Sequence, residues 1–174
     1  MKYSLSSRIL HWLMAVIILG LLGLGIYMTE FLDKESENRM MIFGLHKSFG
    51  VVALILILLR IINRFKNKPP ALPETIKKYE QKLSHLTHYT LYILMLLMPL
   101  SGYLMSNYYG YPVKLFGLQL PFLVEKNFDI GPIFSSAHFY FGYGLLFVVL
   151  LHIAAVIKHR FFDQKENDVL KRMI

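Results

Sequence analysis

Four long apolar segments, separated by polar ones, dominate the pattern of hydrophobic and polar residues along the chain. They cover residues 9–28, 40–62, 89–105 and 134–157. A helix needs about 20 apolar residues, within a range of about 17–25, to cross the hydrocarbon core of a bilayer. All four segments qualify, although the second contains Lys47 and Arg60 and the third contains Pro99. The pattern therefore predicts four membrane-spanning helices in a single domain, residues 1–174.

The first segment has a competing interpretation as a cleavable signal peptide. Its apolar run exceeds the usual ~7–15 residues, and no small-x-small cleavage site follows it, so a spanning helix fits better. The other three segments would lie in the membrane under either interpretation. Four such helices joined by polar connections predict an all-α, up-down-up-down transmembrane bundle.

Composition supports the membrane interpretation and excludes several functions. Hydrophobic residues make up 55% and charged residues 17% of the chain, against about 45–50% and about 25% in soluble proteins. This argues against a small soluble enzyme, a disordered tail or a nucleic-acid-binding module. There is no cysteine, which excludes disulfides, iron–sulfur clusters and covalently attached c-type haem.

The distribution of basic residues predicts the orientation. With both termini and residues 63–84 on one side, that side has fourteen of the nineteen Lys and Arg residues and the other side has five. Cytoplasmic segments carry the excess of Lys and Arg. Both termini are therefore expected in the cytoplasm, with the lipid bilayer surrounding the helices.

Four histidines fall inside the predicted spans, where ionisable residues are costly and mark function. His11 and His152 lie near the cytoplasmic side, and His46 and His138 lie near the outer side. His138 and His152 are fourteen residues apart, so they share roughly one helix face at levels about 21 Å apart. Each level then offers two imidazoles and no carboxylate, which suits bis-histidine haem b better than zinc or di-iron.

Two glycines repeat the same spacing from the outer histidines. The pattern His-x-x-Phe-Gly places Gly50 after His46 and Gly142 after His138. A glycine four residues on shares the histidine's helix face and leaves room for a flat porphyrin. The alternative is that these small residues only allow close helix packing.

Three further residues are candidates near the cytoplasmic side. Arg60 lies at the level of His152, where it would pair with a haem propionate or extend its charge to the membrane interface. His88 and His159 are predicted to line a quinone pocket, because imidazole donates hydrogen bonds and carries protons near neutral pH. His88 also competes with His11 as the partner of His152.

Several segments together resemble the bacterial cytochrome b561 family over essentially the whole chain. They are Arg8-Ile-Leu-His11-Trp12, His46 with Gly50, Leu83-Ser84-His85-Leu86-Thr87-His88, Ala137-His138 and Leu151-His152-Ile-Ala-Ala. The resemblance implies a four-helix membrane cytochrome with two b haems. It implies His11 and His152 as ligands of the cytoplasmic-side haem and His46 and His138 as ligands of the periplasmic-side haem. It also implies that His88 and His159 lie near ubiquinone.

The activity that the resemblance implies is superoxide oxidation, with electrons passing from periplasmic superoxide through both haems to ubiquinone. Such a site needs positive charge to attract a small anion, yet the outer connections have five basic and six acidic residues. Local clustering, of Lys47, Lys114 and Lys126 for example, would be required. The alternative is an anchor subunit that relays electrons between the quinone pool and a partner dehydrogenase. A non-redox transporter or scaffold would leave the histidine levels unexplained.

Overall fold

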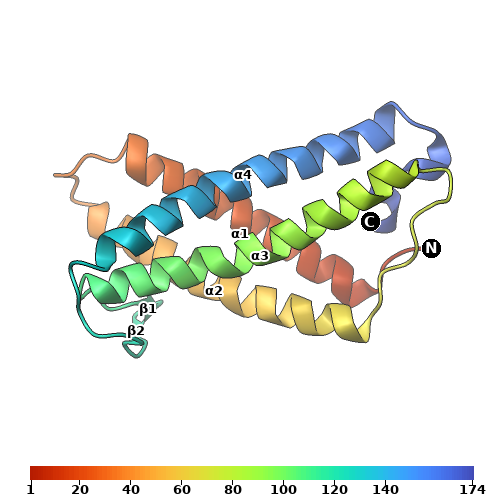
Figure 1. Cartoon of the computed structure of the whole chain (residues 1–174). Helices are drawn as coiled ribbons and strands as arrows, with labels where there is room; N and C mark the ends of the chain where they lie inside the picture. The colour runs from red at the N-terminus through yellow and green to blue at the C-terminus, as the bar shows by residue number, and fades with distance from the viewer.

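The computed structural model describes residues 1–174 as a long four-helix bundle (Figure 1). Its helices are α1 (Leu5–Glu30), α2 (Arg39–Lys66), α3 (Lys78–Tyr108) and α4 (Gly131–Phe161). All four are long and apolar enough to cross a membrane. The predicted all-α transmembrane bundle is therefore confirmed, and each predicted apolar segment lies inside one of these helices.

The helix ends follow local chemistry more closely than they follow hydropathy. The Ser4 hydroxyl caps α1 by accepting a hydrogen bond from the Ser7 backbone N–H, and Pro132 occupies the first turn of α4. The third helix begins at Lys78, well before the apolar segment that starts at residue 89, and it continues through Pro99. Hydropathy marks the part of a helix that lipid covers, so a polar extension beyond that part escapes it.

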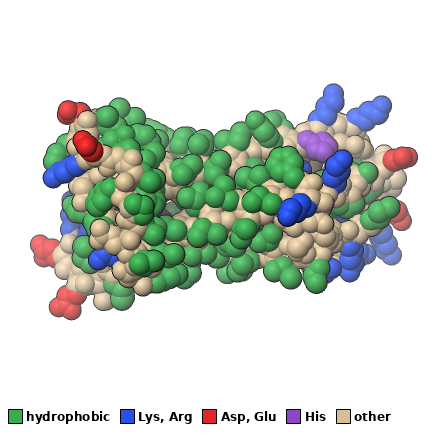
Figure 2. Space-filling view, turned by 90° about the horizontal axis from the view of Figure 1, so that it is seen from below, with side chains coloured by type: hydrophobic (Ala, Val, Ile, Leu, Met, Phe, Trp, Pro, Cys, Tyr) green, Lys and Arg blue, Asp and Glu red, His purple; other side chains and the backbone are tan.

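The helices do not pack equally against one another. Extensive contacts join α3 with α4, α1 with α2, and α2 with α3, whereas α4 approaches α1 and α2 much less closely. Only 17 of the 174 residues are buried. Large apolar side chains such as Val16 and Phe147 are exposed along the middle of the bundle, where Figure 2 shows an almost uncharged belt between two charged ends. Lipid is the solvent that such a surface requires.

The two ends of the bundle differ in structure. Both termini and the α2–α3 connection lie at one end, which we call the terminal end (Figure 1). The opposite, hairpin end contains a feature the sequence did not predict, the antiparallel pair β1 (Lys114–Leu115) and β2 (Leu118–Gln119). Its turn places Phe116 and Gly117 at φ 47° and 101°. The Ser48 hydroxyl fixes the hairpin on α2 by donating to the Lys114 carbonyl and accepting from the Phe116 N–H.

The last residues fold back under the terminal end. Two short 3₁₀ helices, η1 (Lys165–Asn167) and η2 (Leu170–Arg172), follow α4. The buried Arg172 guanidinium donates to the carbonyls of Pro70 and Ala71, each at 2.8 Å. The Trp12 indole N–H donates to the Met173 carbonyl at 2.8 Å. The tail thus connects α1, the α2–α3 connection and the end of α4.

Candidate functional site

His46 of α2 and His138 of α4 face one another near the hairpin end and form what we call the hairpin-end site. Their ring centres are 6.2 Å apart, and the ring planes are inclined at 84°. The pair joins two helices whose backbones do not pack closely. The side chains are therefore near neighbours across a region where the helices leave space.

The hydrogen bonds of His138 leave one ring nitrogen free to bind a metal. Its Nδ1 lies 3.0 Å from the Met98 carbonyl, and the Ser101 hydroxyl lies 3.2 Å from the same nitrogen. A carbonyl only accepts, so Nδ1 carries the proton and Nε2 keeps a lone pair, the arrangement usual for metal-ligating histidine. The buried Nδ1 of His46 has no partner within the protein.

An apolar cavity of about 410 Å³ surrounds this pair. Four glycines line it: Gly25, Gly50, Gly102 and Gly142. A Cβ atom would meet no atom within 4 Å at Gly50, whereas at Gly142 it would lie 3.1 Å from the Met98 methyl. Gly102, which the sequence analysis missed, is the tightest, because a Cβ there would lie 2.7 Å from the His138 ring. The sequence alone does not indicate this role, because Gly102 meets His138 only when α3 packs against α4.

The terminal-end site comprises three histidines from three helices: His11, His88 and His152. The ring centres of His11 and His152 are 6.2 Å apart, and those of His88 and His152 are 5.3 Å apart. The Nδ1 of His88 donates to the Ser84 carbonyl at 2.7 Å. The structure thus places both candidate partners beside His152.

Arg60 points into the terminal-end site. Its Nη2 donates to Nδ1 of His11 at 3.1 Å, and its Nε donates to the Tyr92 hydroxyl at 3.2 Å. This half-buried position against two ring side chains differs from the alternative in which Arg60 extends to the membrane interface. A guanidinium here is a fixed positive charge beside the imidazoles.

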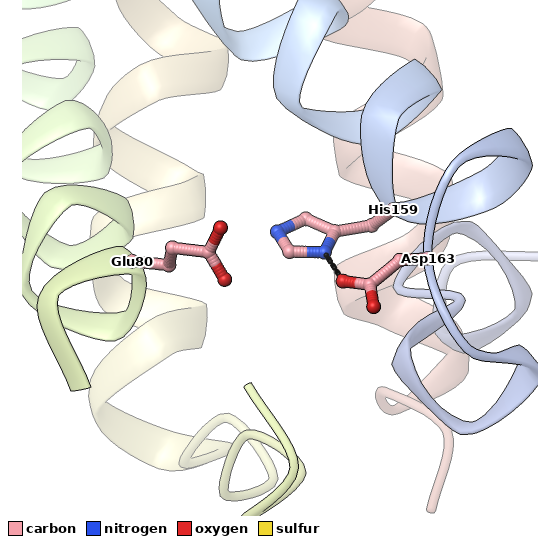
Figure 3. A group of neighbouring side chains, drawn as sticks. All are labelled: Glu80, His159 and Asp163. Carbon is pink, nitrogen blue, oxygen red and sulfur yellow. Dashed lines mark hydrogen bonds and ion pairs between the residues drawn. The ribbon is translucent and has the colours of Figure 1, made fainter. Parts of the chain in front are cut away.

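His159 has partners that the sequence analysis did not anticipate. Its Nδ1 donates to the Asp163 carboxylate at 2.9 Å, and the Glu80 carboxylate lies on the other side of the ring (Figure 3). His159, Glu80 and Asp163 offer ligand atoms within 4.8 Å of one another. The Lys158 ammonium bonds both carboxylates, at 2.6 and 3.2 Å, so it offsets part of their negative charge. His85, the remaining histidine, is exposed.

Haem fits the paired histidines on geometric grounds. Two imidazoles that face one another across the bundle would hold a b-type haem between them through one nitrogen of each ring. Both His46–His138 and His11–His152 are at 6.2 Å. Neither pair includes a carboxylate ligand, and His46 has an unpartnered nitrogen. Four spanning helices with imidazoles facing one another across the bundle define the class of membrane-bound b-type cytochromes.

Comparison with known proteins identifies the family within this class. The model of the prokaryotic cytochrome b561 family matches residues 2–174, and the chain belongs to this family. It is 27% identical to cytochrome b561 homolog 2 of Escherichia coli (strain K12), covering 99% of this chain and 91% of that protein. It is 25% identical to the probable superoxide oxidase CybB of Yersinia pestis, covering 99% and 96%. The family match confirms the resemblance seen in the sequence. Proteins of this family bind b-type haem and transfer electrons in membranes.

Proposed function

We propose that the chain is a two-haem cytochrome that transfers electrons from periplasmic superoxide to ubiquinone at the cytoplasmic side. The observation that carries this proposal is the pair of matched ring-centre separations, each 6.2 Å, at two levels of α4. His46 and His138 would ligate one haem, and His11 and His152 the other. A bound b haem supplies a reversible one-electron couple at each level.

Other residues of the two sites have supporting roles in this proposal. Gly50 and Gly142 line the cavity around the hairpin-end pair without side chains that would obstruct a flat porphyrin. Arg60, beside His11, offers a positive charge for a haem propionate. Because the carbonyl of Met98 holds Nδ1 of His138, the ring presents Nε2 in a fixed orientation.

The proposed orientation places the hairpin end in the periplasm and both termini in the cytoplasm of a bacterial inner membrane. It is supported by the fourteen basic residues on the side of the termini and the five on the other side. The termini lie at the same end of the bundle, as this orientation requires (Figure 1).

Lys47 supports superoxide as the donor. It lines the hairpin-end cavity directly after His46, and its ammonium lies 5.5 Å from the centre of the Tyr111 ring. A positive charge that lines an apolar cavity attracts a small anion even where the surrounding surface is mixed in sign. The superoxide activity in the name of the Yersinia pestis relative points the same way.

Quinone is proposed at the terminal end, with His88 and His159 lining its pocket. Both side chains are partly buried, both are tied through Nδ1 to an acceptor, and both therefore present Nε2 to a ligand. Imidazole donates and accepts hydrogen bonds and can carry a proton, which quinone reduction needs.

Stopped-flow absorbance of the purified, oxidised cytochrome mixed with a superoxide pulse tests the proposal. Fast haem reduction, followed by reoxidation only when ubiquinone is present, is expected. Haem reduction by dithionite or quinol but not by superoxide would contradict superoxide as the donor.

The acidic residues of the hairpin end favour a second candidate, an anchor subunit that relays electrons between quinone and a partner dehydrogenase. The connections at the hairpin end contain six acidic and five basic residues. Figure 2 shows acidic side chains gathered at the hairpin end. A partner subunit with a basic docking surface would use this charge. Co-purification of a dehydrogenase with the native cytochrome, together with failure of the superoxide experiment, would establish it.

A further inference from the structure

Four side chains form one hydrogen-bonded group at the terminal end, which we call the His159 cluster: Glu80, Lys158, His159 and Asp163. Glu80 belongs to α3, Lys158 and His159 to α4, and Asp163 to the segment after α4. Lys158 joins the two carboxylates, and Asp163 holds the His159 ring. Figure 3 shows Glu80 and Asp163 on opposite sides of the His159 ring.

Exposure changes across the cluster from water to interior. The side chain of Lys158 is 44% exposed, whereas those of Asp163, Glu80 and His159 are 19%, 16% and 12% exposed. The cluster therefore connects the solvent at the terminal end with a covered imidazole. His159 lies two helical turns from His152 on nearly the same face of α4.

Asp163 has the properties of a fixed anion. Hydrogen bonds from the Asn167 side chain, the Gln164 N–H and His159 hold the pKa of its carboxyl far below the usual range of aspartate. The carboxylate stays charged at physiological pH and keeps Nδ1 of His159 as a donor. Proton exchange is thereby directed to Nε2, the ring atom on the side of Glu80.

Quinone reduction at this end requires protons as well as electrons. One ubiquinone takes up two electrons and two protons to form ubiquinol, and two superoxide anions supply the electrons as they become two molecules of oxygen. The hydrocarbon core excludes protons, so both must enter from the aqueous end of the bundle.

We propose that the His159 cluster is the proton entry for quinone reduction. His159 passes the proton to the quinone, and Asp163 and Glu80 position the imidazole and supply its next proton. The inference rests on the proposed function, because it needs quinone to be reduced at the terminal end. Protons enter where Lys158, 44% exposed, meets Glu80, pass to Nε2 of His159 and leave to the quinone oxygen. The electrons do not pass through the cluster.

The experiment compares a proton-coupled acceptor with one that takes electrons alone. The purified holoprotein, reduced with one equivalent of dithionite, is mixed with a short-chain ubiquinone or with ferricyanide between about pH 6 and about pH 9. In Asp163→Asn we expect reoxidation by ubiquinone at least tenfold slower at the alkaline end, since general acid–base catalysis contributes about 10²–10⁴. The reoxidation rate of this variant should fall as pH rises. Without the cluster, the protons come directly from solvent, where their concentration falls with rising pH.

Controls separate proton transfer from folding and from quinone binding. Reoxidation by ferricyanide, both haem spectra and the ubiquinone affinity measured by calorimetry should match wild type. Glu80→Gln provides a second variant of the cluster, with an effect in the same direction. Glu166→Gln is the matched control, because Glu166 is exposed and lies three residues from Asp163.

The possible results distinguish the two proposals. Wild-type pH profiles in both Asp163→Asn and Glu80→Gln would overturn the proton entry while leaving the proposed function intact. Slowed ferricyanide reoxidation or lost quinone affinity would overturn it in favour of a structural or binding role. A wild-type protein that ubiquinone fails to reoxidise would overturn the proposed function itself.

Discussion

The hairpin-end and terminal-end sites differ in what surrounds their imidazoles. The hairpin-end site has two histidines in a glycine-lined apolar cavity, and a backbone carbonyl orients His138. The terminal-end site has three histidines, and the Arg60 guanidinium donates to one of them. The first site therefore offers a single pair of imidazoles, whereas the second offers three rings from which a pair could be drawn.

The difference follows from the chemistry proposed at each end. A site that exchanges only electrons with a small anion needs haem ligands, room for the flat porphyrin and one positive charge nearby. A site that passes electrons to quinone also needs hydrogen-bond donors and proton carriers, and these bring additional histidines and carboxylates. The variants below either break this contrast or measure it.

Removal of one hairpin-end ligand should have the largest effect. His138→Ala is expected to halve the haem content per chain and abolish reduction by superoxide, while the terminal-end haem remains. The two levels are fourteen residues apart on α4, about 21 Å, so the change should stay local. Pyridine haemochrome assay against protein concentration measures the content, and the exposed His85→Ala is the control. Retention of both haems in His138→Ala would contradict the ligand assignment.

Gly102→Ala tests how tightly the hairpin-end site is packed. The added methyl would lie 2.7 Å from the His138 ring, so the ring must move away from its position beside Met98. Partial loss of the hairpin-end haem, or a shift of its reduction potential, is expected in a redox titration, with the terminal-end haem unchanged. Gly44→Ala is the matched control, because a Cβ there meets no atom within 4 Å. Equal behaviour of the two variants would show that the ring tolerates the added methyl.

Comparing His11→Ala with His88→Ala resolves the choice at the terminal-end site. The ring centres of His11 and His152 are 6.2 Å apart, the same separation as in the His46–His138 pair, whereas His88 lies 5.3 Å from His152. His11→Ala should therefore lose the terminal-end haem, and His88→Ala should keep it but reoxidise more slowly with quinone.

The hydrogen bonds of His11 in the structure oppose its assignment as a ligand through Nε2. A guanidinium only donates, so the contact with Arg60 gives Nδ1 of His11 the acceptor role and leaves the proton on Nε2. Ligation through Nε2 requires Arg60 to turn to another acceptor, and a propionate is one. Loss of haem in His88→Ala with retention in His11→Ala would reverse the assignment.

The fold could be predicted from sequence because its causes are local. Runs of apolar residues of spanning length determine the bundle, and the fourteen-residue spacing on α4 brings two histidines to roughly one face. Depth in the membrane predicted that His46 lies near His138 and that His11 or His88 lies near His152, and the structure places these rings close together.

Features that depend on packing between distant segments could not be predicted in this way. Gly102 matters only because α3 lies against His138, and Asp163 matters only because the chain turns back after α4. The third histidine at the terminal end is visible in the sequence, but its distance from His152 requires the crossing of α3 and α4. The fold of the polar C-terminal tail likewise follows from contacts far along the chain.

The tail supplies the smallest predicted effect, and it bears on the terminal end alone. Arg172→Ala removes the donor to the carbonyls of Pro70 and Ala71, which lie more than 95 residues away in the chain. A hydrogen bond from a charged group contributes about 1.5–3 kcal/mol, so thermal unfolding in detergent should begin earlier while both haem spectra at low temperature stay intact. Lys171→Ala is the matched control, because that side chain is 60% exposed and touches only Asp168 in an ion pair. Heating should release the terminal-end haem of Arg172→Ala before the hairpin-end haem. Identical melting of the two variants would mean that the tail does not stabilise this end of the bundle.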